Sequence, residues 1–170
     1  QKQVREALPL LESAAGKKPQ EFRPNFYLAE ALAEDGQFGR AEERYQAALE
    51  VDPKSAAATL GLGRARARQG QLAGAAPLYQ KAAELDASYK DALLELAAQF
   101  EAAKQPAEAM AIYKQFPENA AARERLGQLL LDAGKPDEAA VNLEMAVLKS
   151  PTPANRLALA MAYVRSKEFN

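Results

Sequence analysis

The sequence lacks two residue types that carry much of protein chemistry, cysteine and histidine. Zinc and copper sites mostly use thiolate or imidazole ligands, so sites for these metals are nearly excluded. A cysteine nucleophile and a Ser-His-Asp triad are excluded outright, because their reacting groups are missing. The acidic residues show no calcium-loop spacing. We therefore expect no metal site, no cofactor and no catalytic site.

Long apolar runs are also missing, because no stretch approaches the ~20 apolar residues of a membrane span. The first residues, QKQVREALPLLESAAGKKP, scatter charges through the stretch and do not form the apolar core of a signal peptide. The chain does not begin with methionine, so we expect it to be a piece of a longer protein.

An excess of one charge is absent too. The 170 residues include 22 basic and 23 acidic side chains, for a formal net charge of −1. A nucleic-acid-binding domain usually has a clear basic excess, so we expect no nucleic-acid partner. A hydrophobic content of 48% with 26% charged residues is enough to build a folded core.

What the sequence does contain is an internal repeat. The stretch YLAEALAEDGQFGRAEERYQAALEVDP returns 34 residues later as GLGRARARQGQLAGAAPLYQKAAELDA. A leucine and an alanine stand 13 residues apart in four successive copies. These pairs are Leu28 and Ala41, Leu62 and Ala75, Leu96 and Ala109, and Leu126 and Ala139. Partial copies stand at both ends of the chain.

Each copy has the pattern of two helices. In the first complete copy, apolar residues fall at helical spacing, and Gly36 then ends the first helix. A second helix follows, and Asp52-Pro53 ends it. In the fourth copy Pro136-Asp137 marks a helix start.

These blocks resemble the tetratricopeptide repeat, whose pattern has L-G-x2-Y followed by A-x3-F. The second block appears as Ala41/Tyr45, Ala75/Tyr79, Ala109/Tyr113 and Ala139/Leu143. The resemblance implies an all-α, right-handed superhelix of helical hairpins with four complete repeats and a half repeat at each end. The expected divisions are the second helix of a partial repeat at 1–21, repeats at 22–55, 56–89, 90–119 and 120–152, and a first helix at 153–170.

Some positions depart from the family pattern. The tryptophan column holds Asn25, Thr59, Leu93, Arg123 and Arg156, and we expect this column to be exposed or lightly packed. The third copy has 30 residues rather than 34, which predicts a second helix shorter by about one turn. We expect a local irregularity of the superhelix there.

The stretch GLGRARARQGQ, residues 61–71, has glycines that invite comparison with a phosphate loop. It lacks the lysine and the preceding strand that such loops need, so we expect Gly63 to be a helix contact and Gly70 a turn. On a helix, Arg64 and Arg68 share a face, whereas Arg66 points about 200° away from Arg64. Arg66 falls in a core column, where its aliphatic stem is expected to cover the core.

By resemblance, the first helices of the repeats face a concave groove that binds a peptide. The groove is expected to have a mixed surface with an apolar line of Phe26, Leu60 and Leu94, although these three residues equally fit packing between helices. The candidate groove residues are Phe26, Tyr27, Glu30, Leu60, Arg64, Arg68, Leu94, Glu95, Ala98, Arg125 and Gln128. The carboxylate clamp and the asparagine ladder of two family subtypes are absent from this surface.

The resemblance therefore implies a noncatalytic scaffold or adaptor that binds a protein or peptide. Arg64 and Arg68 either bind an acidic group of that partner or are simply solvated. Two alternatives remain open: self-assembly through the repeat ends, and a docking arm for an enzyme whose catalytic domain lies elsewhere. The compartment is open between cytoplasm and periplasm, and the alanine- and arginine-rich composition hints at a bacterial source.

Overall fold

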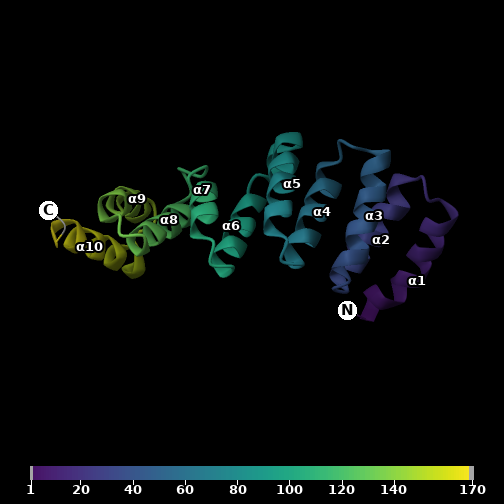
Figure 1. Cartoon of the computed structure of the whole chain (residues 1–170), viewed down its shortest axis with the longest axis horizontal. Coiled ribbons are helices and arrows are strands. Elements are labelled where there is room, and N and C mark those ends of the chain that lie inside the picture. The colour runs from purple at the N-terminus through teal and green to yellow at the C-terminus, as the bar shows by residue number, and fades with distance from the viewer. Residues whose placement is uncertain (1, 169–170) are drawn as a thin grey trace. The chain divides into compact units, whose positions relative to one another are not determined.

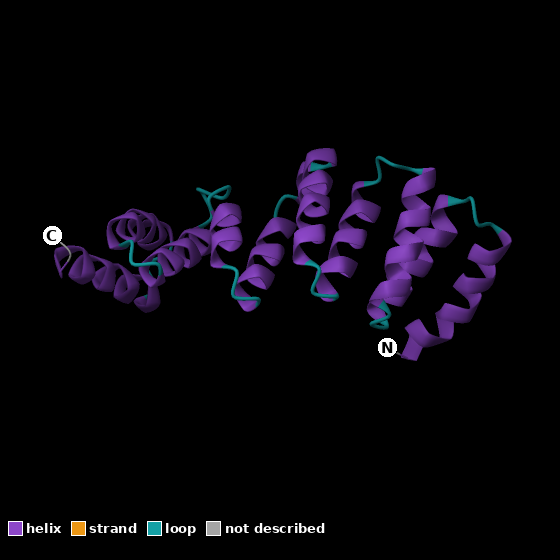
Figure 2. Ribbon diagram, viewed as in Figure 1, coloured by secondary structure: helices purple, strands orange, loops and turns teal. Residues whose placement is uncertain are grey.

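The computed structural model describes residues 2–168, and within that range every long element is an α-helix, with no strand. Figure 2 shows these helices joined by short loops. The helices are α1 (Lys2–Lys17), α2 (Phe22–Glu34), α3 (Phe38–Val51), α4 (Ala56–Arg68), α5 (Leu72–Leu85), the 3-10 helix η1 (Ala87–Tyr89), α6 (Ala92–Ala102), α7 (Pro106–Tyr113), α8 (Ala120–Asp132), α9 (Pro136–Lys149) and α10 (Pro153–Glu168).

The chain divides into two compact units, one ending at Leu96 and the other beginning at Ala97. In the first unit α2 packs on α3 and α4 on α5, and α3 also contacts α4, so that each hairpin packs on its neighbour (Figure 1). In the second unit α8 packs on α9 and α9 packs on α10. The predicted all-α array of helical hairpins is confirmed.

The turns within the hairpins depend on a left-handed residue just after the first helix. Gly36, Gly70 and Gly134 have φ angles of 84°, 78° and 70°. The backbone N–H of the next residue then donates to a carbonyl one turn and a half back, as Gln37 does to Leu32 over 2.8 Å. This closes the helix end and confirms the turn predicted at Gly36.

The third hairpin makes the same turn without a glycine. Lys104 has a φ of 58°, and Gln105 N–H donates to the carbonyl of Phe100 over 2.8 Å. A lysine side chain is strained in this backbone region, because its Cβ crowds the following carbonyl. In this hairpin the left-handed turn therefore forms without the glycine that favours it at the other three turns.

Side chains and prolines mark several helix starts. The Ser55 hydroxyl accepts a hydrogen bond from Ala58 N–H over 3.2 Å, and the Asn119 side chain accepts one from Ala122 N–H over 3.0 Å. Pro136 occupies the first turn of α9, as its position before an apolar run predicts. Each device satisfies or removes a backbone donor that has no partner inside the helix.

The core consists of alanines where helices approach closely, with larger side chains between them. Ala41, Ala75, Ala109 and Ala139 are each 0% exposed, and Tyr79 is 0% exposed as well. A column of alanines lets the second helix of a hairpin lie close to the first. These are the four alanines that define the sequence repeat.

The second helix of the third hairpin is short. Helix α7 has 8 residues, whereas α3, α5 and α9 have 14 each. It ends at Tyr113, and the chain turns through Phe116 and Pro117 before α8 begins. The predicted shortening is confirmed, and it exceeds one helical turn.

The column that holds tryptophan in the family was expected to be exposed or lightly packed, and this was wrong for three of its five residues. Arg123 is half-buried and Arg156 is exposed. Asn25 and Thr59 are 0% exposed and Leu93 is 3% exposed. Asn25 donates to the carbonyls of Pro19 and Glu21 over 2.8 and 2.9 Å, and the Thr59 hydroxyl donates to the Ser55 carbonyl over 2.8 Å. These polar side chains are buried because the preceding turn satisfies their hydrogen bonds.

The last helix corrects the sequence alignment by one residue. Asn155 is 1% exposed and donates to the Ser150 carbonyl over 2.8 Å, as Asn25 does to Pro19. Asn155, rather than Arg156, therefore occupies the Asn25 place. Tyr163 is 46% exposed, and its hydroxyl donates to Glu144.

None of the helices described within residues 2–168 is both long enough and apolar enough to span a membrane.

Candidate functional site

The two glycines of GLGRARARQGQ that precede the arginines lie inside α4, so they form no phosphate-binding loop. A Cβ on Gly61 would come within 2.4 Å of the Tyr45 ring, and one on Gly63 within 3.0 Å of the Tyr79 ring. Both glycines therefore let α4 approach tyrosines of the neighbouring helices α3 and α5. The prediction that Gly63 is a helix contact is confirmed.

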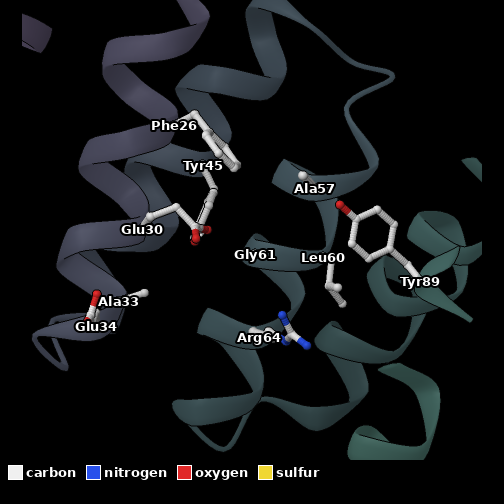
Figure 3. Close-up of a pocket in the computed structure, with 10 residues that line it drawn as sticks. All are labelled: Phe26, Glu30, Ala33, Glu34, Tyr45, Ala57, Leu60, Gly61, Arg64 and Tyr89. Atoms are coloured by element: carbon white, nitrogen blue, oxygen red, sulfur yellow. Dashed lines mark hydrogen bonds between the residues drawn. The ribbon is translucent and has the colours of Figure 1, made fainter. Parts of the chain in front are cut away.

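Beside this close approach lies a pocket of about 420 Å³ in the first unit (Figure 3). Most of its wall comes from the first helices of two successive hairpins, α2 and α4. The remaining wall is Tyr45 of α3 and Tyr89 of η1. The lining residues of α2 and α4 are Phe26, Glu30, Ala33, Glu34, Ala57, Leu60, Gly61 and Arg64.

One part of the pocket is aromatic. Phe26 is stacked on Phe22 with ring centroids 5.3 Å apart, and it meets the edge of Tyr45 at 6.1 Å. Tyr89 stands across the opening from Phe26, with Ala57 between them (Figure 3). The Phe26 ring is held by its neighbours, so this wall is formed before any ligand binds.

The other part of the pocket carries charge. The buried Tyr45 donates its hydroxyl proton to Glu30, which fixes that carboxylate beside the pocket. Burial, together with this hydrogen bond, raises the pKa of Tyr45 well above its ordinary value. Glu34, one turn further along α2, is exposed and makes no hydrogen bond or ion pair with any residue that the structure describes.

Arg64 is the basic residue of the lining, and it is already paired. Its Nε and Nη2 both donate to Glu95 Oε2, over 3.1 and 2.8 Å. Partial burial opposes the charge of the guanidinium, but the hydrogen bond and attraction to Glu95 outweigh it and raise the Arg64 pKa. The pair is half-exposed, with side-chain exposures of 50% and 42%.

The other two arginines of the stretch engage different groups. The Arg68 guanidinium lies 5.1 Å from the centroid of the Phe38 ring and is not part of the pocket lining. Arg66 donates to Glu42 over 2.8 Å, with its side chain 28% exposed. Arg66 is half-buried, and its head group reaches a carboxylate rather than solvent alone. Arg64 and Arg68 leave the same helix face toward different partners.

The three residues of the predicted apolar line differ in exposure. Phe26 and Leu94 are half-buried, whereas Leu60 is 3% exposed. Leu60 therefore belongs largely to the packing between helices and offers only an edge to the pocket. Tyr27 is 55% exposed and meets Phe26 edge-on, with centroids 5.6 Å apart.

Three predicted groove residues, Ala98, Arg125 and Gln128, belong to the second unit. Ala98 is exposed, Gln128 donates to Asp132 over 3.2 Å, and the Arg125 Nε donates to Glu101 over 3.1 Å. Glu101 also accepts the hydroxyl proton of Tyr113 over 2.6 Å. Tyr113, Glu101 and Arg125 thus form a hydrogen-bonded chain from the core to the surface.

Sequence reasoning missed part of the pocket. Glu34 stands four residues after Glu30 on α2, and this helical spacing was a usable signal for a second carboxylate on the same face. Tyr89 had no such signal, because it lies in a 3-10 turn between repeats that the helical periodicity does not describe.

A family model described as tetratricopeptide repeat matches residues 28–90 and 104–152. Comparison with curated proteins finds no match.

Solved structures share the fold. MamA has a TM-score of 0.72 at 21% identity, with 87% of this chain and 89% of that chain covered. YrrB, described as a TPR protein with an unusual peptide-binding site, has a TM-score of 0.65 at 20% identity, with 92% and 84% covered. The C-terminal part of a TPR repeat-containing protein from Cytophaga hutchinsonii has a TM-score of 0.77 at 17% identity, with 98% and 67% covered.

Proposed function

The chain belongs to the tetratricopeptide repeat family, and from this premise we propose that it is a noncatalytic scaffold that binds a segment of a partner protein on the first unit. The observation that supports this is the pocket between α2 and α4, whose lining includes half-buried Phe26 and the unpaired carboxylate of Glu34. Exposed Tyr27 meets Phe26 edge-on outside the lining. A stacked helical array is a protein-interaction framework, and YrrB of the same fold is described as having a peptide-binding site.

The size and composition of the pocket suit one anchoring side chain of a partner rather than a large small-molecule ligand. Its volume of about 420 Å³ is near the lower end of the usual range for ligand pockets. Aromatic side chains contribute contact area at a small entropic cost, because they have few rotatable bonds. A partner segment that crosses α2 and α4 would contact Tyr27 outside the pocket and place one side chain inside it.

The sequence-based hypothesis places an acidic group of the partner near Arg64 and Arg68. In this arrangement a partner carboxylate competes with Glu95 for Arg64, and it would have to draw Arg68 away from the Phe38 ring. Binding of an acidic ligand would therefore replace the ion pair of Arg64 with Glu95 by another ion pair. Because one carboxylate only takes the place of another, the ligand gains little net electrostatic stabilisation at Arg64.

The proposed function is tested by panning a random peptide display library on the immobilised chain. Enriched peptides are then measured by isothermal titration calorimetry on the chain, on Ala57→Gln, which places a longer side chain in the pocket, and on Ala73→Gln, at an exposed position of α5. We expect the first variant to lose binding and the second to retain it. Equal binding to both variants would refute the pocket as the binding site.

A second candidate function is self-association through α10. Leu157, Met161 and Val164 recur at helical spacing on this helix and are 64%, 38% and 58% exposed. An exposed apolar stripe of this kind suits a second copy of the chain. Sedimentation velocity over a dilution series tests the idea, with Leu157→Lys expected to shift an associating chain toward monomer; a chain that is monomeric at every concentration contradicts it.

A further inference from the structure

The charges around the pocket in the first unit do not cancel. Two carboxylates of α2, Glu30 and Glu34, belong to the lining, whereas the one lining cation, Arg64, is neutralised by Glu95. Glu30 accepts a hydrogen bond from the hydroxyl of Tyr45, and because this hydroxyl is neutral the bond leaves the negative charge of Glu30 uncompensated. Glu34 has no partner among the described residues. The pocket therefore presents net negative charge to its occupant.

We propose that this pocket takes the side chain of an arginine or a lysine from the partner segment. This inference rests on the proposed function, because it names the chemistry of the group that enters the same pocket. The occupant has an aliphatic stem and a cationic head, and the pocket has an aromatic part and an acidic part to match them.

The arrangement of the walls gives the occupant a direction. Phe26 and Tyr89 stand on opposite sides of the opening, while Glu30 and Glu34 lie further along α2 from Phe26 (Figure 3). A basic side chain that enters beside the two rings has its stem against apolar surface, as such stems usually do. Its head then lies near aromatic faces and carboxylates, both of which attract a cation.

An acidic side chain fits the same pocket poorly. It would meet the carboxylates of Glu30 and Glu34, and its one cationic partner, Arg64, is already held by two hydrogen bonds to Glu95. Like charges at short range repel, and this repulsion is stronger where the site is partly shielded from water. Charge complementarity thus favours the basic occupant.

Three capped amino acids probe the pocket without requiring knowledge of the partner: N-acetyl-arginine amide, N-acetyl-citrulline amide and N-acetyl-glutamate amide. Citrulline has nearly the shape of arginine without its charge, so the first two isolate the effect of charge. Each is titrated into the isotopically labelled chain, and the amide signals of Ala57, Gly61 and Glu34 are followed by NMR. We expect the arginine probe to shift these signals in a saturable and salt-sensitive way, at least several-fold more tightly than citrulline.

A matched pair of variants then locates the charge. Glu34→Gln removes an exposed carboxylate of the lining, and Glu43→Gln removes an exposed carboxylate of α3 that is not in the lining. Glu34→Gln removes the exposed ion pair between Glu34 and the arginine probe, and we expect this change to weaken binding of the probe about two- to fivefold. No change is expected in Glu43→Gln. Circular dichroism of both variants confirms that the helices are intact.

The outcomes separate this inference from the proposed function. Equal binding of the arginine and citrulline probes, tighter binding of the glutamate probe, or no shift of the three amide signals would each overturn the basic occupant. The proposed function would survive those results if library peptides still lose binding on Ala57→Gln. A further result is that library peptides bind Ala57→Gln and Ala73→Gln equally while the arginine probe still shifts the pocket signals. In that case the pocket binds a cation but not the partner segment.

Discussion

Replacing Gly61 by alanine is the sharpest test of how α4 is packed. A Cβ at this position would lie 2.4 Å from both Cε1 and Cζ of the Tyr45 ring, about 1 Å inside ordinary van der Waals contact. Tyr45 is 2% exposed and its hydroxyl is bonded to Glu30, so the ring has little room to move. Either the ring or the whole of α4 must shift.

The magnitude follows from two opposing effects. Alanine in place of glycine stabilises a helix interior by about 0.5–1 kcal/mol. Overpacking a close-packed core costs typically 1–3 kcal/mol. We therefore expect Gly61→Ala to lower the free energy of unfolding by about 1–2 kcal/mol. Gly74→Ala is the matched control, because its nearest neighbour would be Arg66 Cδ at 3.8 Å, an ordinary contact; it should stabilise the chain by about 0.5 kcal/mol.

The assay is urea unfolding followed by circular dichroism at neutral pH, with the midpoint and slope of each variant compared with those of the parent chain. Amide hydrogen exchange of α4 shows whether the loss is local to this hairpin. Adding Tyr45→Leu, which removes the clashing ring atoms, should make the Gly61→Ala change less costly than it is alone. If Gly61→Ala has the same free energy of unfolding as Gly74→Ala, α4 does not approach Tyr45 as closely as the structure shows.

The remaining predictions concern the turn, the tyrosine chain and the buried polar column. Lys104→Gly should raise the free energy of unfolding by about 0.5–1 kcal/mol, because glycine accepts the positive φ of 58° without strain. Gly70→Lys should lower the free energy of unfolding for the same reason. Urea midpoints of both variants equal to that of the parent chain would contradict this. Burial and the hydrogen bond to Glu101 raise the pKa of Tyr113 to about 12 from 10.0. The contribution of this raised pKa to stability is therefore full below pH 10 and is lost as the pH rises toward 12. Tyr113→Phe should make the urea midpoint depend less steeply on pH across that window, and an unchanged slope would argue against the buried phenol. Asn25→Ala removes three hydrogen bonds of a fully buried side chain, two donated to backbone carbonyls and one accepted from Arg44, and should cost about 2 kcal/mol in thermal and urea unfolding. Arg156→Ala, at an exposed position, should not show this cost.

Much of the fold follows from spacing in the sequence, because a helical hairpin constrains its neighbours at a fixed interval. The alanines at 41, 75, 109 and 139 mark where helices must approach, and all four are fully buried. The glycines at 36, 70 and 134 mark the turns, and all three have positive φ. The shortened third copy predicted a short α7 for the same reason, since missing residues must come out of one element.

The errors in the fold prediction arose where the side chain, rather than the spacing, decides burial. Asn25 and Thr59 are polar and looked exposed, but hydrogen bonds to the preceding turn allow them to be buried. In the last helix Arg156 was aligned with Asn25, whereas the hydrogen bond from the Asn155 side chain to the Ser150 carbonyl sets the register one residue earlier. Such bonds are invisible to a pattern of apolar residues.

The candidate site was harder to predict than the fold. Helix faces grouped Phe26, Glu30 and Arg64 as groove candidates, and the structure brings these three residues together in the lining of one pocket. The net charge of the pocket depends on which group Arg64 contacts, and that is a property of three-dimensional packing between α4 and α6. Tyr89 reaches the pocket from a turn, where helical periodicity carries no information.

The most direct test of the central claim is a crystal structure of the chain bound to a peptide enriched from the display library. We predict that the peptide crosses α2 and α4, with an arginine or lysine side chain between Phe26 and Tyr89 and its cationic head near Glu30 and Glu34. A peptide bound on another surface, or one that places an acidic side chain against Arg64 in this pocket, would contradict it.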